Sequence, residues 1–138
     1  MPGLHVELAT PIRLVLAEEA DEVVIPGSDG YFGVLPGHAP LLALLGAGEV
    51  MCRTGRTERY LAVSGGFAEV GPERVTILAE TAERPEEIDT ARAQAARDRA
   101  ERLLAGRGGD EEIDYAQAAQ ALERAQVRLR VATRRLTG

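Results

Sequence analysis

Glycine and proline crowd the segment 25–42, IPGSDGYFGVLPGHAPLL, between apolar ends. Glycine tolerates positive φ, and proline fixes φ and removes a backbone donor. A segment of this kind is therefore a defined system of turns rather than a flexible linker. It belongs to an architecture of short strands separated by turns.

The first part of the chain has the period of β-strands. Leu4, Val6 and Leu8 alternate with polar neighbours, and turn residues such as Gly71-Pro72-Glu73 punctuate the runs that follow. Further short runs of this kind span residues 12–16, 22–25, 49–53, 59–63, 67–70 and 75–78. This pattern predicts an N-terminal all-β sandwich or barrel over residues 1–83.

The period changes to that of helices after Pro85, a residue that suits the first turn of a helix. One expected helical face consists of Ile88, Ala91, Ala95, Ala96, Ala100, Leu103 and Leu104, before a stop at Gly106. A second helix has a seam with alternating spacings of three and four residues: Tyr115, Ala118, Leu122, Ala125, Leu129, Ala132 and Leu136. The short turn between them predicts a C-terminal antiparallel α-helical hairpin over residues 84–138.

The hairpin seam is rich in alanine, which buries only one methyl group. Its stability therefore depends on the leucines and Ile88, each worth about 1.5–3 kcal/mol if fully buried. We expect a hairpin that opens or changes partners at a cost of a few kcal/mol. The alternative is a rigid hairpin that is permanently packed on the sandwich.

Composition excludes several classes of function. The net charge is −6, and arginines alternate with acids in the second half, so no nucleic-acid footprint is present. One cysteine, Cys52, and two histidines cannot form a structural zinc site, so no metal is expected. Cys52 is expected to be a small buried hydrophobe.

We find no leader or long apolar span, so membrane attachment is expected only through partners. An enzyme would need a nucleophile and a base, for which only Ser28 or Ser64 with His38 is conceivable. No nucleophile elbow of the form GxSxG is present, so we expect no catalytic residues.

Several separated motifs resemble the ε subunit of F-type ATP synthases of the bacterial type. They are VIPGSDGYFGVLPGHAPLL, the SGGF turn at 64–67, AERPEEIDTARA at 82–93 and, more loosely, ALERAQVRLRVA at 121–132. The resemblance implies a non-catalytic central-stalk subunit that couples proton flow to ATP synthesis by linking γ to the c-ring. It implies the γ, c, α and β subunits as partners, no required cofactor, and a peripheral position on the cytoplasmic face of the bacterial inner membrane.

By the same resemblance, Ser28, Tyr31 and His38 lie at the end of the sandwich that faces the c-ring and γ. The family commonly has an acidic residue between Gly30 and Phe32, where this chain has Tyr31. This replacement favours hydrogen bonding or stacking over a charge contact. The alternative for Tyr31 and His38 is a turn residue without a partner.

The helical part resembles the regulatory element of the family, which is either compact against the sandwich or extended along γ, where it blocks ATP hydrolysis. In the extended state an acidic segment of β would meet Arg124, Arg128, Arg134 and Arg135. The alternative is a solvated helix face with intrahelical ion pairs.

The segment Ile88-Asp89-Thr90-Ala91-Arg92-Ala93 is similar to the motif by which some bacterial ε subunits bind ATP. The residues carried over from that motif and its surroundings are Glu83, Ile88, Asp89, Arg92, Ala93, Arg99, Arg124 and Arg128. The chain has no phosphate-cradling glycine loop, so such a site would sense ATP rather than hydrolyse it. The alternative is that Asp89 only supports the first helical turn and that Arg92 and Arg99 are solvated.

A free-standing β-sandwich adaptor with a coiled-coil arm would share the same periodicity. It would have no reason to carry both the Pro-Gly-His-Ala-Pro turn and the Ile-Asp-x-x-Arg-Ala motif. The ε-subunit interpretation therefore accounts for more of the sequence.

Overall fold

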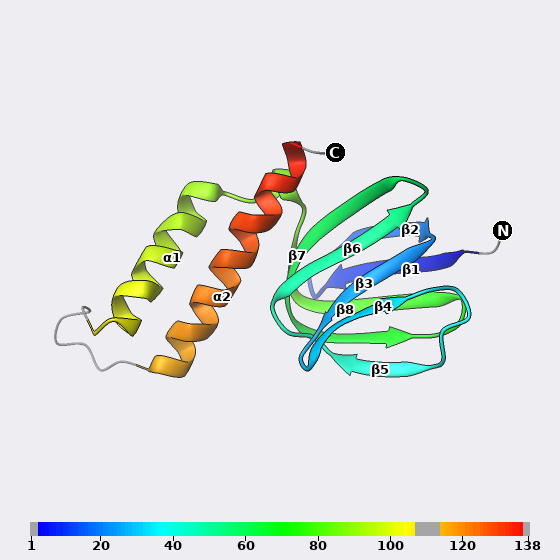
Figure 1. Cartoon of the computed structure of the whole chain (residues 1–138), viewed down its shortest axis with the longest axis horizontal. Coiled ribbons are helices and arrows are strands. Elements are labelled where there is room, and N and C mark those ends of the chain that lie inside the picture. The colour runs from blue at the N-terminus through cyan, green and yellow to red at the C-terminus, as the bar shows by residue number, and fades with distance from the viewer. Residues whose placement is uncertain (1–2, 107–113, 137–138) are drawn as a thin grey trace.

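A computed structural model of the chain describes residues 3–106 and 114–136, in which a β-sandwich is followed by two helices (Figure 1). The strands are β1 (Leu4–Thr10), β2 (Arg13–Ala20), β3 (Glu22–Gly27), β4 (Gly30–Val34), β5 (Leu41–Leu44), β6 (Gly48–Thr54), β7 (Thr57–Val70) and β8 (Arg74–Glu83). The helices are α1 (Thr90–Leu104) and α2 (Tyr115–Ala132), with short 3-10 turns η1 (Pro85–Glu87) and η2 (Thr133–Leu136). The predicted fold class is confirmed.

The strands form one continuous hydrogen-bonded path that folds into the sandwich. Their order is β2-β1-β8-β7-β6-β3-β4, and β5 pairs with β7 beside this path. All pairs are antiparallel except β1 with β8, where Val6 lies opposite Val75 in a parallel register. The first strand of the chain therefore lies directly beside the last strand of the sandwich.

Strand β7 bends so that its two halves serve different neighbours. Its first half pairs with β6 and its second half with β5, and the bend falls at Gly65 and Gly66, with φ of 69° and 94°. A Cβ on Gly66 would overlap the Leu78 carbonyl oxygen of β8. The sequence predicted a tight turn between two strands here, and that prediction was wrong. The backbone of β8 follows the bend, so one strand continues through it.

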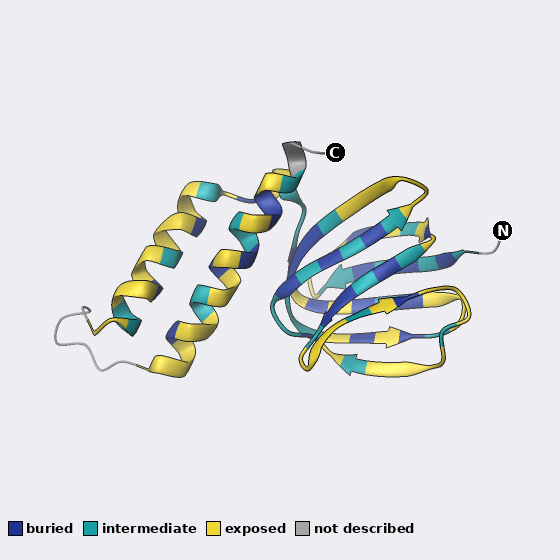
Figure 2. Cartoon of the chain, viewed as in Figure 1, coloured by how far each residue is buried: buried dark blue, intermediate teal, exposed yellow. Residues whose placement is uncertain are grey.

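Alternating burial along the strands supplies the core of the sandwich (Figure 2). Leu4, Val6 and Leu8 point inward from β1 and are fully buried, as their alternation predicted. Cys52 lies among these aliphatic side chains, and burial raises the pKa of its thiol to about 12. The expectation that Cys52 is a small buried hydrophobe is confirmed.

The two helices run side by side and contact each other through alanine (Figure 1). Each begins with an aspartate cap: the Asp89 carboxylate accepts from the Arg92 backbone N at 3.1 Å, and the Asp114 carboxylate accepts from the Gln117 N at 3.0 Å. The buried alanines of the two helices are Ala93, Ala100, Ala118, Ala125 and Ala132. Small side chains let the two helices approach each other closely.

The face predicted for the first helix is confirmed at Ala100, which is buried, and was wrong in the first turns of the helix. Ala91, Ala95 and Ala96 are exposed, whereas Ala93 is buried. The prediction counted the helical period from Ile88, which precedes α1 and packs on the sandwich instead. In the second helix Leu122 and Leu129 are only half-buried, Tyr115 is exposed, and the Leu136 side chain lies outside the described residues.

No described helix is both long and apolar enough to cross a membrane.

Candidate functional site

A small apolar interface holds the hairpin against the sandwich. It is a buried cluster of Ala62, Ile88, Val127, Val131 and Ala132, with the half-buried Ala47 packed against it. Ile88 comes from the linker after η1, and the other helical members come from the C-terminal half of α2. The helix α1 lies on the far side of α2, so α2 makes most of the contact with the strands (Figure 1).

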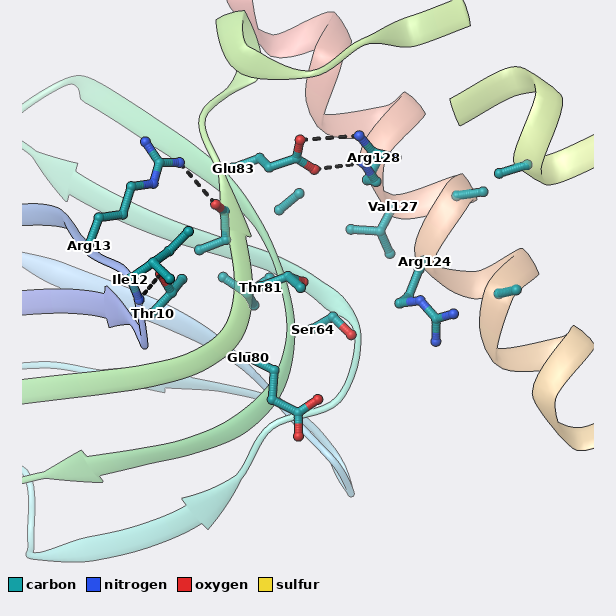
Figure 3. Close-up of a pocket in the computed structure, with 16 residues that line it drawn as sticks. Thr10, Ile12, Arg13, Ser64, Glu80, Thr81, Glu83, Arg124, Val127 and Arg128 are labelled. Atoms are coloured by element: carbon teal, nitrogen blue, oxygen red, sulfur yellow. Dashed lines mark hydrogen bonds and ion pairs between the residues drawn. The ribbon is translucent and has the colours of Figure 1, made fainter. Parts of the chain in front are cut away.

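Next to this interface the sandwich and α2 enclose an open groove of about 460 Å³ (Figure 3). Its helical wall is formed by Ala96, Ala121, Arg124, Ala125, Val127 and Arg128. Its strand wall is formed by Thr10, Ile12, Arg13, Ala62, Val63, Ser64 and residues 80–83. Apolar side chains therefore dominate the floor, while the arginines and Glu80 and Glu83 bring charge to the rim.

Glu83 and Arg128 form a bidentate ion pair across the groove (Figure 3). The Arg128 Nε donates to Glu83 Oε1 at 2.6 Å, and the Nη2 donates to Oε2 at 3.1 Å. Both side chains are partly screened from solvent. Glu83 is the last residue of β8, so this pair ties α2 to the point where the chain leaves the sandwich.

Arg124 lies one helical turn before Arg128 on the same side of α2, and Ser64 and Glu80 lie across the groove (Figure 3). The Arg124 side chain makes no ion pair with any described residue. A guanidinium at the mouth of an apolar groove can bind an anionic ligand through two parallel hydrogen bonds.

The other residues predicted to bind ATP lie at the start of α1 or on the exposed side of this helix. Arg92 and Arg99 are exposed and lie one turn on either side of Ala96, the α1 residue that lines the groove. Asp89 uses its carboxylate to cap α1, while Ile88 and Ala93 are buried in packing. The structure thus brings Glu83, Arg124 and Arg128 together, with Arg92 and Arg99 on the adjoining helix face.

The residues expected to face the c-ring do not form one cluster. Ser28 is exposed in the turn between β3 and β4, whereas His38 follows the other end of β4. The five residues of β4 separate the two ends by roughly 15 Å. His38 Nδ1 lies 2.7 Å from the Ala39 carbonyl oxygen.

Tyr31 has a hydrogen-bonding partner within the chain. Tyr31 is 55% exposed, and its hydroxyl accepts from the backbone N of Glu49 at 2.9 Å. Tyr31 lies in strand β4 rather than in a turn, and its hydroxyl contacts β6.

The four arginines expected to contact the β subunit divide into three groups. Arg128 and Arg134 are bound to carboxylates of the sandwich, Arg124 is exposed, and the Arg135 side chain lies outside the described residues. The Arg134 Nη2 lies 3.2 Å from Glu49 Oε2, and this carboxylate raises the pKa of Arg134. In this compact arrangement the sandwich occupies two of the four arginines.

Sequence reasoning missed an apolar surface on the outside of the sandwich. Leu44 of β5, Phe67 of β7 and Leu78 of β8 lie opposite one another in adjacent strands and are exposed, and Leu42 adds a side chain that is 69% exposed. The signal was present in the run PLLALL at 40–45, whose apolar residues do not alternate with polar ones. Exposed apolar surface of this kind is typical of protein–protein contacts.

The comparison with known protein families identifies both halves of the chain. Residues 3–85 match the family described as ATP synthase, Delta/Epsilon chain, beta-sandwich domain, and residues 86–133 match its long alpha-helix domain. The chain belongs to the ATP synthase delta/epsilon family. Such chains are non-catalytic subunits of the ATP synthase complex, so the predicted family and the absence of catalysis in the chain alone are confirmed.

Individual relatives agree with this assignment. The ATP synthase epsilon chain of Moorella thermoacetica is 56% identical over 108 residues, which cover 78% of this chain and 81% of the relative. That of Syntrophobacter fumaroxidans is 49% identical over 129 residues, covering 94% and 95%. The chain also resembles a solved structure of Euglena gracilis mitochondrial ATP synthase that contains OSCP, F1 and the c-ring. The TM-score is 0.80 at 26% identity, and the match covers 96% of this chain and 82% of that one.

Proposed function

We propose that this chain is a central-stalk subunit that links γ to the c-ring and couples proton flow to ATP synthesis, and that its hairpin regulates ATP hydrolysis. The observation that carries the proposal is the way in which the hairpin is held. A few apolar side chains and ion pairs that water partly reaches fix it to the sandwich. A domain held in this way can leave its site at a modest free-energy cost.

The outer apolar surface supports a permanent contact with γ. Leu42, Leu44, Phe67 and Leu78 together expose a continuous apolar face that a stable partner would cover. This face lies on the sandwich, so γ can stay bound while the hairpin moves. The turn at Ser28 and the exposed Tyr31 ring are available to the polar loops of c, and His38, at the other end of β4, would face γ.

The extended state would use the arginines of α2 and η2 against an acidic segment of β. Bidentate guanidinium–carboxylate pairs suit this contact. Arg128 already forms such a pair with Glu83, and Arg134 forms an ion pair with Glu49 through its Nη2. Arg124 and Arg135 would complete the basic face. Inhibition would then require the compact pairs to break first.

ATP would favour the compact state by binding at the groove. Arg92, Arg99, Arg124 and Arg128 can neutralise phosphates from two helices that stay adjacent only in the hairpin. Asp89 and Glu83 offer carboxylates for the adenine amino group, and Ile88 and Ala93 hold the backbone in place. Binding that requires both helices stabilises the hairpin by RT ln(1+[L]/Kd), so falling ATP would release it.

The bacterial relatives support a peripheral location on the cytoplasmic face of the inner membrane, reached through the complex. In this proposal the chain requires no cofactor, and ATP acts only as a regulatory ligand.

The deciding experiment measures ATP hydrolysis by a bacterial α–β–γ complex with the full chain or with a chain that ends at Arg84, which keeps β8 intact. We expect both to bind γ and only the full chain to inhibit, with ATP relieving the inhibition. If both bind and neither inhibits, the regulatory part fails and the rotor part stands. If neither binds a closely matched complex, the whole proposal fails.

A second experiment tests the ATP site by calorimetric titration of the full chain with ATP. Arg124→Gln should weaken binding at least about tenfold, since it removes a charged contact to phosphate. Arg56→Gln is the matched control, because Arg56 is exposed in the turn between β6 and β7, away from the groove. Equal affinities for the two variants would exclude Arg124 from the site.

A further inference from the structure

A cluster of side chains outside the groove fixes the last turn of the hairpin. Glu49 of β6 lies under this turn and its side chain is only 13% exposed. The Arg134 Nη2 lies 3.2 Å from Glu49 Oε2, and the Arg130 Nε lies 3.5 Å from Glu49 Oε1. One shielded carboxylate therefore serves two guanidinium groups from the end of α2 and from η2.

An aromatic ring completes the cluster. The Arg134 guanidinium carbon lies 4.1 Å from the centre of the Tyr60 ring of β7, a cation–π contact. The planar guanidinium is thus held by a ring on its face and by a carboxylate at its edge. An isolated surface ion pair contributes little, whereas this combination is shielded and has several contacts.

The backbone of Glu49 is itself fixed by the neighbouring strands β3 and β4. The Tyr31 hydroxyl accepts from the Glu49 N at 2.9 Å. Gly48 makes this approach possible, because a Cβ there would lie 2.5 Å from the same hydroxyl and from the Pro26 Cβ. The carboxylate of Glu49 is therefore presented from a rigid position rather than from a mobile loop.

We infer that Glu49 and Tyr60 form an internal receptor for the C-terminal turn, which occupies Arg134 in the compact state and so keeps it from an acidic partner. The inference rests on the proposed regulatory function, and it adds the residues that compete with the partner. While its Nη2 is paired with Glu49 and its guanidinium carbon lies over the Tyr60 ring, Arg134 is held on the sandwich and cannot at the same time reach a carboxylate of a separate partner. Each state of the hairpin therefore excludes the other at this residue.

The two sides of this pair predict opposite effects on inhibition. Glu49→Gln weakens the internal receptor and leaves Arg134 intact, so the hairpin should inhibit more strongly. Arg134→Gln also releases the turn, but it removes the group that the partner binds, so inhibition should weaken. A merely structural role would move both variants in the same direction.

The test uses the full chain in two measurements, with Glu73→Gln as the control. Glu73 is exposed, and its carboxylate makes no ion pair with any described residue, so the control removes the same charge. Hydrogen exchange of the α2 amides reports release of the turn, because an undocked helix is marginal in water. Hydrolysis by the α–β–γ complex reports inhibition.

We expect Glu49→Gln and Arg134→Gln to speed α2 exchange about five- to tenfold, and Glu73→Gln to leave it unchanged. Glu49→Gln should also halve, or lower further, the chain concentration needed for half-maximal inhibition, while Arg134→Gln should raise it. Unchanged exchange in Glu49→Gln would overturn the inference, as would shifts of inhibition in the same direction. If the unaltered chain does not inhibit at all, the proposed function fails, and faster exchange in Glu49→Gln would still support the receptor.

Discussion

The sandwich core and the interface between the sandwich and the hairpin are held by different chemistry. The core is a continuous set of fully buried aliphatic side chains from strands that are distant in sequence. The interface consists of a few small apolar residues bordered by ion pairs that water partly reaches. Buried aliphatic area gives stability that salt and small ligands change little, whereas exposed pairs are easily exchanged for others. The difference suits a rigid platform that carries a detachable arm.

The largest effect should come from the bend in β7. Gly66→Ala places a Cβ against the Leu78 carbonyl oxygen at a φ of 94°, so the backbone of β7 or β8 must move. We expect it to lower the free energy of unfolding by at least about 3 kcal/mol, measured by urea denaturation. Gly55→Ala is the control, since its φ of 61° is strained but nothing lies within 4 Å, and it should cost about 1 kcal/mol. Equal costs would show that β8 adapts to the added methyl group.

The comparison is sharpened by removing the same side chain from each region. Val75 of β8 and Val131 of α2 are both fully buried. Val75→Ala should lower the free energy of global unfolding by about 2 kcal/mol. Val131→Ala should leave global unfolding nearly unchanged and speed hydrogen exchange in α2 alone, because it weakens only the docking. If both variants lower the free energy of global unfolding equally, the sandwich and the hairpin unfold as one cooperative unit and do not differ in the way described above.

A smaller effect should appear at acidic pH, at the linker between the two regions. Hydrogen bonds from the Arg13 side chain and then from the Arg84 backbone lower the pKa of Glu87 from 4.5 to about 2. A lowered pKa in the folded state means that the contact stabilises fully above pH 4.5 and is lost as the pH falls towards 2. After allowance for solvent screening we expect about 1 kcal/mol.

The pH effect is measured as the free energy of unfolding between pH 7 and pH 2. Glu87→Gln should flatten the fall that begins below pH 4.5 and should lower stability at pH 7. Glu86→Gln is the control, because Glu86 makes no hydrogen bond or ion pair with the described residues through its carboxylate. A profile for Glu87→Gln that matches that of the unaltered chain would show that the Arg13 contact is not formed in solution.

The smallest effect should come from the hydroxyl of Tyr31. Tyr31→Phe removes the acceptor for the Glu49 backbone N, but water can replace it at this partly exposed site. We expect a loss of about 0.5 kcal/mol, read from thermal unfolding. Tyr115→Phe should have no effect, since Tyr115 is exposed and its hydroxyl makes no hydrogen bond to a described residue. A loss of several kcal/mol for Tyr31→Phe would show that the sandwich itself depends on this hydrogen bond and is less rigid than we propose.

Local sequence patterns predicted which segments form strands and helices. They could not predict features that depend on contacts between segments far apart in the sequence. Strict alternation in β1 identified its buried face, because side-chain direction in a strand depends only on the strand itself. The continuous β7 was read as two strands, since Gly65 and Gly66 look like a turn unless β8 is known to follow their bend. The buried face of α1 was predicted correctly at Ala100 but not in its first turns, because Ile88, which precedes the helix, was taken as helical.

The candidate site could be predicted only in part. Glu83 and Arg128 are 45 residues apart. The family resemblance placed both in one candidate ATP site, but their ion pair was not predicted, since neither periodicity nor spacing connects them. Glu49 and Arg134 are 85 residues apart, and no motif marked them as a pair. Ion pairs between distant elements leave no local signature, because each partner alone is an ordinary charged surface residue.

The parallel pairing of β1 with β8 sets an order for synthesis. The first strand to leave the ribosome waits for its neighbour until Val75 and the rest of β8 have been made. The sandwich therefore closes late, and the hairpin emerges only after its platform can be complete. Each new copy thus makes the whole sandwich before the second helix has a surface to dock against.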